Sequence, residues 1–183
     1  MKIENLCKSY GNKKVLENLS LDLPDSGVTL LCGPSGRGKT TLLRLLAGLE
    51  KPDSGTVSSV GRVSYLFQED RLFPTLTAEE NVRLVSEAGA PLLDKLGLAD
   101  SRDKKPSELS GGMKRRVALA RALAFDADTY LFDEPFKGLD ATLKNTALDL
   151  ILTVTAGKRV ILVTHEPEEL LPIAAKVVDL GEV

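Results

Sequence analysis

The sequence predicts an α/β fold with a mostly parallel sheet, an N-terminal antiparallel β part and a small inserted helical subdomain. Short apolar runs at 28–32, 129–132 and 159–164 alternate with segments of helical periodicity, as parallel strands joined by helices do. Residues 1–8 and about 15–23 instead alternate apolar and polar side chains, which is typical of half-buried antiparallel strands. Residues from about 72 to 107 form short pieces broken by Pro74, Pro91 and Pro106. We therefore expect one domain over residues 1–183, with the subdomain at about 72–115.

The remaining elements follow from periodicity and from stop signals. Leucines at positions 42, 43, 45 and 46 predict a helix that ends at Gly48, and Asp140 begins a longer helix that ends at Gly157. The other expected elements are strands near 56–59, 63–67 and 176–180, helices over 78–88 and 111–124, and a short helix led by Pro167.

Composition excludes several classes of protein. A 43% hydrophobic and 27% charged chain of 183 residues is ordinary for a soluble globular domain, and a net charge of −2 gives no basic field for nucleic acid. The N-terminus lacks the apolar stretch of a signal peptide, and no run approaches the roughly 18 apolar residues of a membrane helix. The two cysteines, Cys7 and Cys32, are expected to be buried in a reducing compartment. We expect a cytoplasmic protein whose membrane role, if it has one, depends on partners.

One loop indicates a nucleotide. Residues 33–40 read G-P-S-G-R-G-K-T, which fits G-x-x-x-x-G-K-[ST] between a predicted strand and a predicted helix. Glycines let backbone N–H groups converge on phosphate oxygens, while Lys39 supplies a charge and the Thr40 hydroxyl is placed to hold Mg²⁺. This pattern predicts a P-loop NTPase core, but kinases, GTPases, recombinases and transport motors all share it. Arg37 is unusually large for the loop and either adds charge near the phosphates or points to solvent.

A second motif supplies carboxylates. The apolar run 129–132 ends in Asp133 and Glu134, and burying such a pair costs several kcal/mol unless a cation compensates. A strand end beside a Mg-nucleotide provides that compensation. Asp133 is then expected to coordinate Mg²⁺, and Glu134 to polarise the water that attacks the γ-phosphate.

A third motif, Leu109-Ser110-Gly111-Gly112-Met113 before a helix, resembles the signature of ATP-binding-cassette (ABC) ATPases. The resemblance covers essentially the whole chain, because the other family motifs occur in the family's order. Ser110, Gly111 and Gly112 at a helix N-terminus also read physically as a second anion site. The stretch 67–74 and Met113 are most similar to bacterial import-system ATPases of the nitrate, sulfonate and taurine type.

The resemblance implies a set of site residues. Glu134, His165 and Gln68 are the expected catalytic residues, and Thr40, Gln68 and Asp133 the expected metal ligands. Ser110, Gly111 and Gly112 are expected to act in trans, on the nucleotide of another subunit, and Asp140 to lie in a dimer-interface loop. The residues expected to bind ATP are Tyr10, which stacks on adenine, and Gly33, Pro34, Ser35, Gly36, Arg37, Gly38, Lys39, Thr40 and Thr41.

The implied function is ATP hydrolysis that powers a membrane transporter, with ATP and Mg²⁺ bound between two head-to-tail subunits. The implied partners are a second ABC ATPase subunit, identical or similar, separate transmembrane permease subunits and, in an importer, a substrate-binding protein. A non-transport ABC ATPase of DNA repair or the ribosome is the alternative, but it calls for coiled-coil insertions or two cassettes, which this sequence lacks. A small-molecule kinase leaves residues 109–113 unexplained.

Two features depart from the family pattern. Lys137 occupies a position where small residues are common, in a loop expected to approach the partner subunit. The interval from Gln68 to Leu109 is short, so the helical subdomain is expected to be trimmed.

Overall fold

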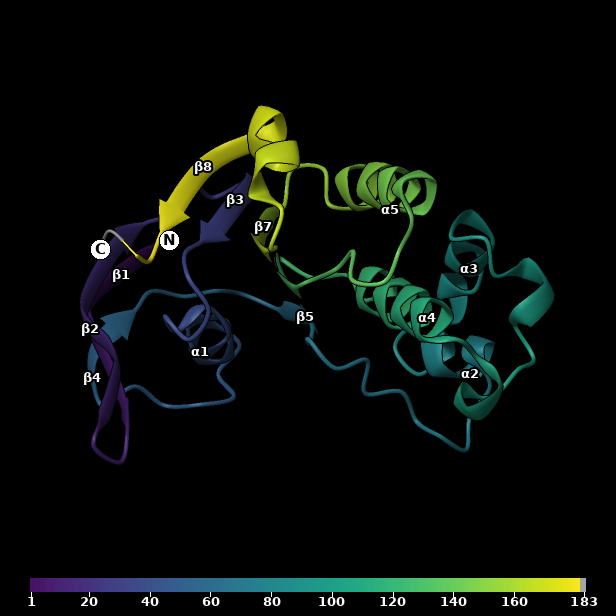
Figure 1. Ribbon diagram of the computed structural model, residues 1–183, viewed down its shortest axis with the longest axis horizontal. Coiled ribbons are helices and arrows are strands. Elements are labelled where there is room, and N and C mark those ends of the chain that lie inside the picture. The colour runs from purple at the N-terminus through teal and green to yellow at the C-terminus, as the bar shows by residue number, and fades with distance from the viewer. Residues whose placement is uncertain (182–183) are drawn as a thin grey trace. The chain divides into compact units, whose positions relative to one another are not determined.

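The computed structural model describes residues 1–181 (Figure 1). Its contacts divide the chain into two compact units. The first holds residues 1–63, 127–133 and the part from 157 onward, and the second holds residues 64–126 and 134–156.

The first unit contains the expected antiparallel sheet. Its strands β1 (Lys2–Tyr10), β2 (Lys13–Asp22) and β4 (Ser54–Val57) lie in the order β2-β1-β4, and both neighbouring pairs are antiparallel. Ile3, Leu6 and Leu19 are buried within a pattern of alternating side chains. A register shift between Ile3 and Leu6 interrupts that pattern, since residues three apart on a regular strand point to opposite sides. The antiparallel N-terminal part predicted from this alternation is confirmed.

The second sheet is parallel over the strands that carry the phosphate loop. Its order is β5-β6-β7-β3-β8, with β5 at Val63–Leu66, β6 at Thr129–Asp133, β7 at Arg159–Val163, β3 at Gly27–Cys32 and β8 at Ala174–Asp179. The pairs β6–β7, β7–β3 and β3–β8 are all parallel. Every residue of β6 and of β7 is buried, as in strands covered on both faces. Helix α1 (Lys39–Leu46) buries Leu42 and Leu43 and contacts β6 and β7.

The second unit is mainly helical (Figure 1). Helix α4 (Gly111–Ala124) packs against α2 (Ala78–Arg83) and α3 (Pro91–Lys95), and the fully buried Val82, Leu93 and Val117 lie in this core. The helix α5 (Ala141–Val154) also belongs to this unit. Short 3₁₀ turns complete it: η1 (Glu87–Gly89), η2 (Ala99–Ser101) and η3 (Pro106–Glu108).

Some local expectations were wrong. Helix α2 ends at Arg83 instead of residue 88, because the backbone at Ser86 is extended before η1 begins. The expected short helix led by Pro167 is present, as the 3₁₀ helix η4 (Pro167–Ile173) with Pro172 inside it. Cys7 and Cys32 are free but only partly buried, and Cys32 is the last residue of β3. No helix within residues 1–181 is long and apolar enough to cross a membrane.

Candidate active site

The register of the parallel sheet gathers site residues at one edge of the first unit. Val163 of β7 pairs with Asp133 of β6 on one side and with Leu31 of β3 on the other. The loop that starts at Gly33, the carboxylate of Asp133 and the segment leading to His165 therefore leave the sheet at its carboxyl edge. Open α/β sheets bind ligands at this edge.

The phosphate loop is a tight backbone turn that leads directly into α1. Gly38, the N-cap of α1, has φ +90 and no capping side chain, and a Cβ there would lie 2.8 Å from Leu16 Cδ2. Only glycine fits this position, since its backbone is left-handed and packs on β2. The N–H groups of the first helical turn are thus left for a ligand, at the positive end of the helix.

Lys39 is buried at 9% exposure and already points into the loop. Its Nζ donates to the carbonyl oxygen of Gly33 at 2.6 Å and to that of Pro34 at 3.0 Å. These bonds hold the ammonium against the loop backbone, where it would meet a phosphate group. Residues Ser35, Gly36 and Thr41 lie in the same turn and the first turn of α1.

Thr40 and Asp133 form an oxygen pair at the end of the loop. The Thr40 hydroxyl donates to Oδ2 of Asp133 at 2.8 Å, and Asp133 is 1% exposed. Oxygens of this kind, a hydroxyl and a carboxylate, are ligands that Mg²⁺ accepts together with substrate phosphates and water. The sequence placed these two residues in one metal site, and the fold brings them into contact.

Arg37 is exposed, in line with the solvent-facing orientation considered from the sequence, and its guanidinium also contacts the chain. Its Nη2 donates to the carbonyl oxygen of Gly181 at 3.2 Å, and it lines a cavity of about 110 Å³ with Lys14 and Glu17 of β2. The guanidinium thus joins the loop to the segment after β8, while its side chain stays exposed.

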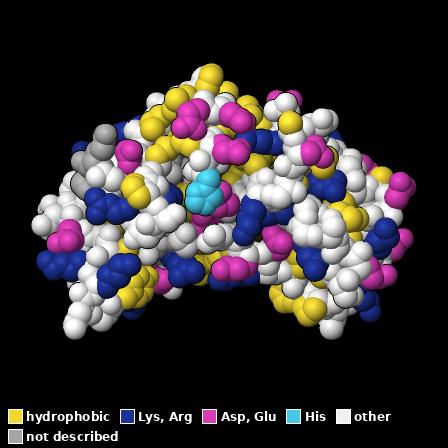
Figure 2. All heavy atoms as spheres, in the orientation of Figure 1, with side chains coloured by type: hydrophobic (Ala, Val, Ile, Leu, Met, Phe, Trp, Pro, Cys, Tyr) yellow, Lys and Arg dark blue, Asp and Glu magenta, His cyan; other side chains and the backbone are white. Residues whose placement is uncertain are grey.

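Tyr10 and His165 both reach the surface of the first unit. Tyr10 ends β1 with 45% of its surface exposed, and its hydroxyl donates to the Glu50 carboxylate. Partial burial, and then this hydrogen bond, raise the pKa of Tyr10 above its usual value. His165, the only histidine of the chain, is exposed two residues after β7 and appears in cyan on the face shown in Figure 2.

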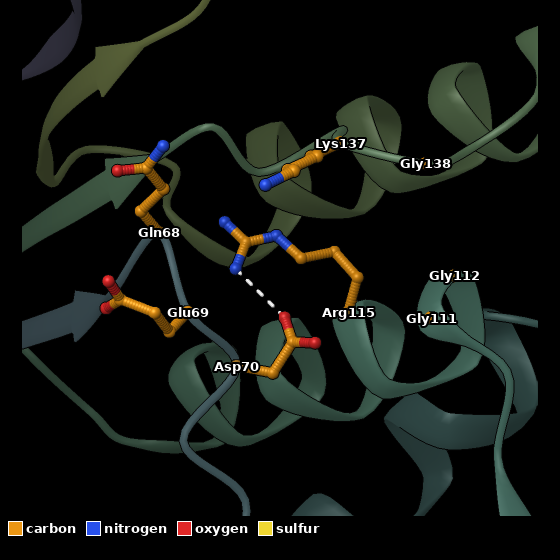
Figure 3. Close-up of a pocket in the computed structure, with 8 residues that line it drawn as sticks. All are labelled: Gln68, Glu69, Asp70, Gly111, Gly112, Arg115, Lys137 and Gly138. Atoms are coloured by element: carbon orange, nitrogen blue, oxygen red, sulfur yellow. Dashed lines mark hydrogen bonds and ion pairs between the residues drawn. The ribbon is translucent and has the colours of Figure 1, made fainter.

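The second unit carries the other predicted site residues. Ser110 caps α4, with its Oγ accepting from the Met113 amide at 3.3 Å, and Gly111 and Gly112 form the first turn. Asp140 caps α5 in the same way, since its Oδ1 accepts from the Leu143 amide at 2.9 Å. A cavity of about 560 Å³ opens beside the start of α4 (Figure 3). It is lined by Gln68, Glu69, Asp70, Gly111, Gly112, Arg115, Lys137 and Gly138.

A substitution at Gly112 tests how closely the start of α4 packs against residues 137–138. A Cβ at Gly112 would lie 2.8 Å from the Gly138 carbonyl oxygen, whereas a Cβ at Gly111 would meet nothing within 4 Å. We expect Gly112→Ala to lower the free energy of unfolding by about 1–3 kcal/mol, the usual cost of overpacking. Gly111→Ala is the matched control and should be neutral or slightly stabilising. Thermal denaturation of both variants measures the difference, and equal stabilities would contradict the packing of residues 137–138 on α4.

Sequence reasoning missed Arg115. This side chain is 3% exposed, and it donates to the backbone of Glu134 and of Phe67 and pairs with Asp70. In the sequence it lies within a basic run, 114–116, which suggests a solvated face. Helical periodicity could have revealed its burial. Arg115 precedes the buried Ala118, Leu119 and Ala122 by three, four and seven residues, so it lies on the same face of the helix.

Comparisons with known proteins agree with this geometry. The family model described as "ABC transporter" matches residues 16–137. The aliphatic sulfonates import ATP-binding protein SsuB 3 of Paraburkholderia xenovorans is 43% identical over 183 residues, covering 96% of this chain and 74% of the relative. The SsuB protein of Corynebacterium glutamicum is 41% identical over 193 residues, covering 98% of this chain and 79% of the relative.

Solved structures show the same fold. The ATP-binding cassette MJ0796, in a dimeric post-hydrolysis state with ADP and Pi, superposes with a TM-score of 0.88 at 28% identity. The match covers 98% of this chain and 94% of that one. The fold and the phosphate-loop edge define a P-loop ATPase. The chain belongs to the ABC transporter family, and its relatives are bacterial import-system ATPases that bind ATP.

Proposed function

We propose that this chain is the nucleotide-binding subunit of a bacterial import system, closing head to tail with a second subunit around Mg-ATP. The observation that carries the proposal is the carboxyl edge of the first unit. There the phosphate loop, Asp133 and the segment to His165 leave neighbouring parallel strands. A nucleotide triphosphate fits this edge because loop amides, a helix N-terminus and Lys39 all favour negative charge.

Mg²⁺ is the metal that the donor set fits. Thr40 Oγ1 and Asp133 Oδ2, 2.8 Å apart, offer two oxygens for one ion, with Gln68 as a further proposed ligand. Among residues 1–181 no group of three or more His, Cys, Asp or Glu forms a metal cluster of its own. Such a sparse protein contribution suits Mg²⁺, which keeps waters and phosphate oxygens as ligands and, when bound, neutralises phosphate charge.

Glu134 is the proposed general base. It follows Asp133 directly, is 8% exposed, and its backbone has φ +57. We propose that its carboxylate accepts a proton from the water that attacks the γ-phosphate, while exposed His165 helps to orient that water. Gln68 follows Phe67, whose backbone carbonyl oxygen accepts a hydrogen bond from Arg115 of α4. We propose that Gln68, which belongs to the second unit, senses the bound nucleotide.

The signature residues would complete the site of the other subunit. Ser110, Gly111 and Gly112 present a hydroxyl and free helix-start amides, which attract a phosphate. The MJ0796 cassette, with 28% identity, forms a dimer in the presence of ADP and Pi. We propose the same arrangement here, with Tyr10 stacking on adenine and the loop of Lys137 and Asp140 facing the partner.

The proposed partners are separate transmembrane permease subunits, with a substrate-binding protein outside the membrane. The support comes from the relatives, which are import ATP-binding proteins for aliphatic sulfonates. We propose a system of that organic-anion class and a location on the cytoplasmic face of the membrane through the permease. In the second unit, Phe73 is 54% exposed and Leu84 is 53% exposed, and both are candidates for that contact.

Co-purification tests the assembly. The chain, tagged and expressed at native level in its own host, is purified from detergent-solubilised membranes. We expect a multispanning membrane protein to co-purify with the chain in a fixed ratio. After reconstitution, the ATPase rate of the complex should rise when substrate-loaded binding protein is added. Recovery with ribosomes or DNA would favour the non-transport alternative, and recovery without any membrane protein would contradict the proposal.

A further inference from the structure

One guanidinium in the second unit contacts the backbone beside two proposed catalytic residues. Arg115 Nε and Nη2 donate to the Glu134 carbonyl oxygen at 3.1 and 2.8 Å. Its Nη1 donates to the Phe67 carbonyl oxygen at 2.7 Å, and Phe67 immediately precedes Gln68. The same nitrogen pairs with Asp70 Oδ1 at 3.2 Å, the contact drawn as a dashed line in Figure 3.

These contacts account for the burial of the charge. Arg115 is 3% exposed, and a buried guanidinium is tolerated only when its donors have acceptors and a counter-charge. Asp70 supplies the counter-charge and remains 26% exposed. Arg121, six residues further along α4, donates to the Asp70 carbonyl oxygen at 3.1 Å and so holds the backbone of that residue. The segment 67–70 is therefore held to α4 at two points.

The backbone of Glu134 needs such support. Its φ of +57 is left-handed, which costs a non-glycine residue about 1–2 kcal/mol. Strained residues of this kind persist where surrounding contacts hold them. Two donors from Arg115 converge on the carbonyl oxygen of this residue, so they restrict the peptide that aims the Glu134 side chain.

We propose that Arg115 is a positioning residue, which sets the direction of the Glu134 carboxylate and ties the Gln68 segment to the same helix. This inference rests on the proposed role of Glu134 as general base. Arg115 touches neither nucleotide nor water in this role; it acts through the backbone of Glu134. The helix that carries it also begins at Ser110, so one rigid element connects the signature, the Gln68 segment and the Glu134 peptide.

The first experiment separates positioning from stability. Arg115→Met and Arg115→Lys are compared with Arg102→Met, which removes the Arg102 ion pairs with Glu79 and Asp94 in the same unit. We expect Arg115→Met to lower kcat about 10²-fold, the size of effect that small misplacement of a catalytic group produces. ATP affinity should change less than about threefold, since no binding contact is lost. Arg102→Met should leave kcat within about twofold.

Arg115→Lys keeps a cation for Asp70 but lacks the planar fork that reaches both carbonyl oxygens. It should lose kcat at least about 10-fold while remaining folded, so it decides the question if Arg115→Met does not fold. A kcat within about twofold of the parent for Arg115→Lys, or a fall in ATP affinity as large as the fall in kcat, would overturn the proposal.

The second experiment asks whether Arg115 acts through Glu134. Single-turnover hydrolysis of labelled ATP is measured for Glu134→Gln alone and combined with Arg115→Lys. We expect the added change to lower the residual rate less than about twofold, because a misdirected glutamine loses nothing further. If Arg115→Lys lowers the rate of the Glu134→Gln chain by as much as it lowers the rate of the parent chain, Arg115 acts independently of Glu134. That result would overturn the inference. If Glu134→Gln alone keeps full activity, the proposed base fails instead, and the two failures are distinguishable.

Discussion

Replacing Glu134 with glutamine is expected to lower kcat on the order of 10³-fold, because a positioned general base contributes roughly 10²–10⁴-fold. Glutamine keeps the shape of the side chain and leaves the backbone bonds from Arg115 to the Glu134 carbonyl oxygen in place. What it removes is the carboxylate that accepts the proton of the attacking water. Nucleotide binding should survive, since the phosphate loop, Lys39 and the Thr40–Asp133 pair belong to the first unit.

The same variant should accumulate as a dimer. If hydrolysis reopens the two subunits, a variant that binds Mg-ATP without hydrolysing it stays closed. Size-exclusion chromatography with light scattering, with and without saturating Mg-ATP, measures this. The matched control is Glu87→Gln, an exposed carboxylate in the second unit whose 3.8 Å pair with Arg83 is expected to be worth little. A Glu134→Gln chain that remains monomeric in Mg-ATP would count against the head-to-tail sandwich.

The features that the sequence predicts well depend on local patterns. Apolar runs fix β6 and β7, and glycines with Lys39 and Thr40 fix the phosphate loop, since these residue types have few alternative uses in that order. The α/β pattern then predicts parallel strand pairing, and this pairing is enough to bring Asp133 against Thr40. For this reason the sequence alone predicts the loop and its oxygen pair.

The features that the sequence does not predict depend on tertiary contacts. A basic residue next to Lys114 and Arg116 looks solvated, yet Arg115 is buried because carbonyls distant in sequence accept its donors. The left-handed backbone of Glu134 has no local signal either, since glutamate does not favour that region. Arg37 is similar, because its partner is a carbonyl of Gly181, at the far end of the described chain.

Replacing Lys39 with alanine is expected to abolish nucleotide binding at ordinary concentrations, a different failure from that of Glu134→Gln. Charge-assisted hydrogen bonds contribute about 1.5–3 kcal/mol each, and losing the one cation buried in the loop should weaken ATP affinity about 10²-fold or more. Lys39 also donates to the Gly33 and Pro34 carbonyl oxygens, so the empty loop loses two bonds that shape it. Both effects weaken the binding of the phosphates and leave the proposed general base, Glu134, unchanged.

Titration calorimetry with ATP, ADP and adenosine resolves the contributions. Binding of ATP and ADP should fall together in Lys39→Ala, while the weak binding of adenosine should stay the same, because adenosine has no phosphate for Lys39 to meet. Lys14→Ala is the control of equal charge change, since its pair with Glu17 is highly exposed. Arg37→Ala should weaken ATP binding far less than Lys39→Ala, because its guanidinium is bonded to the Gly181 carbonyl oxygen. Equal losses in the Arg37 and Lys39 variants would mean that both cations face the phosphates, and that Arg37 leaves Gly181 when nucleotide binds.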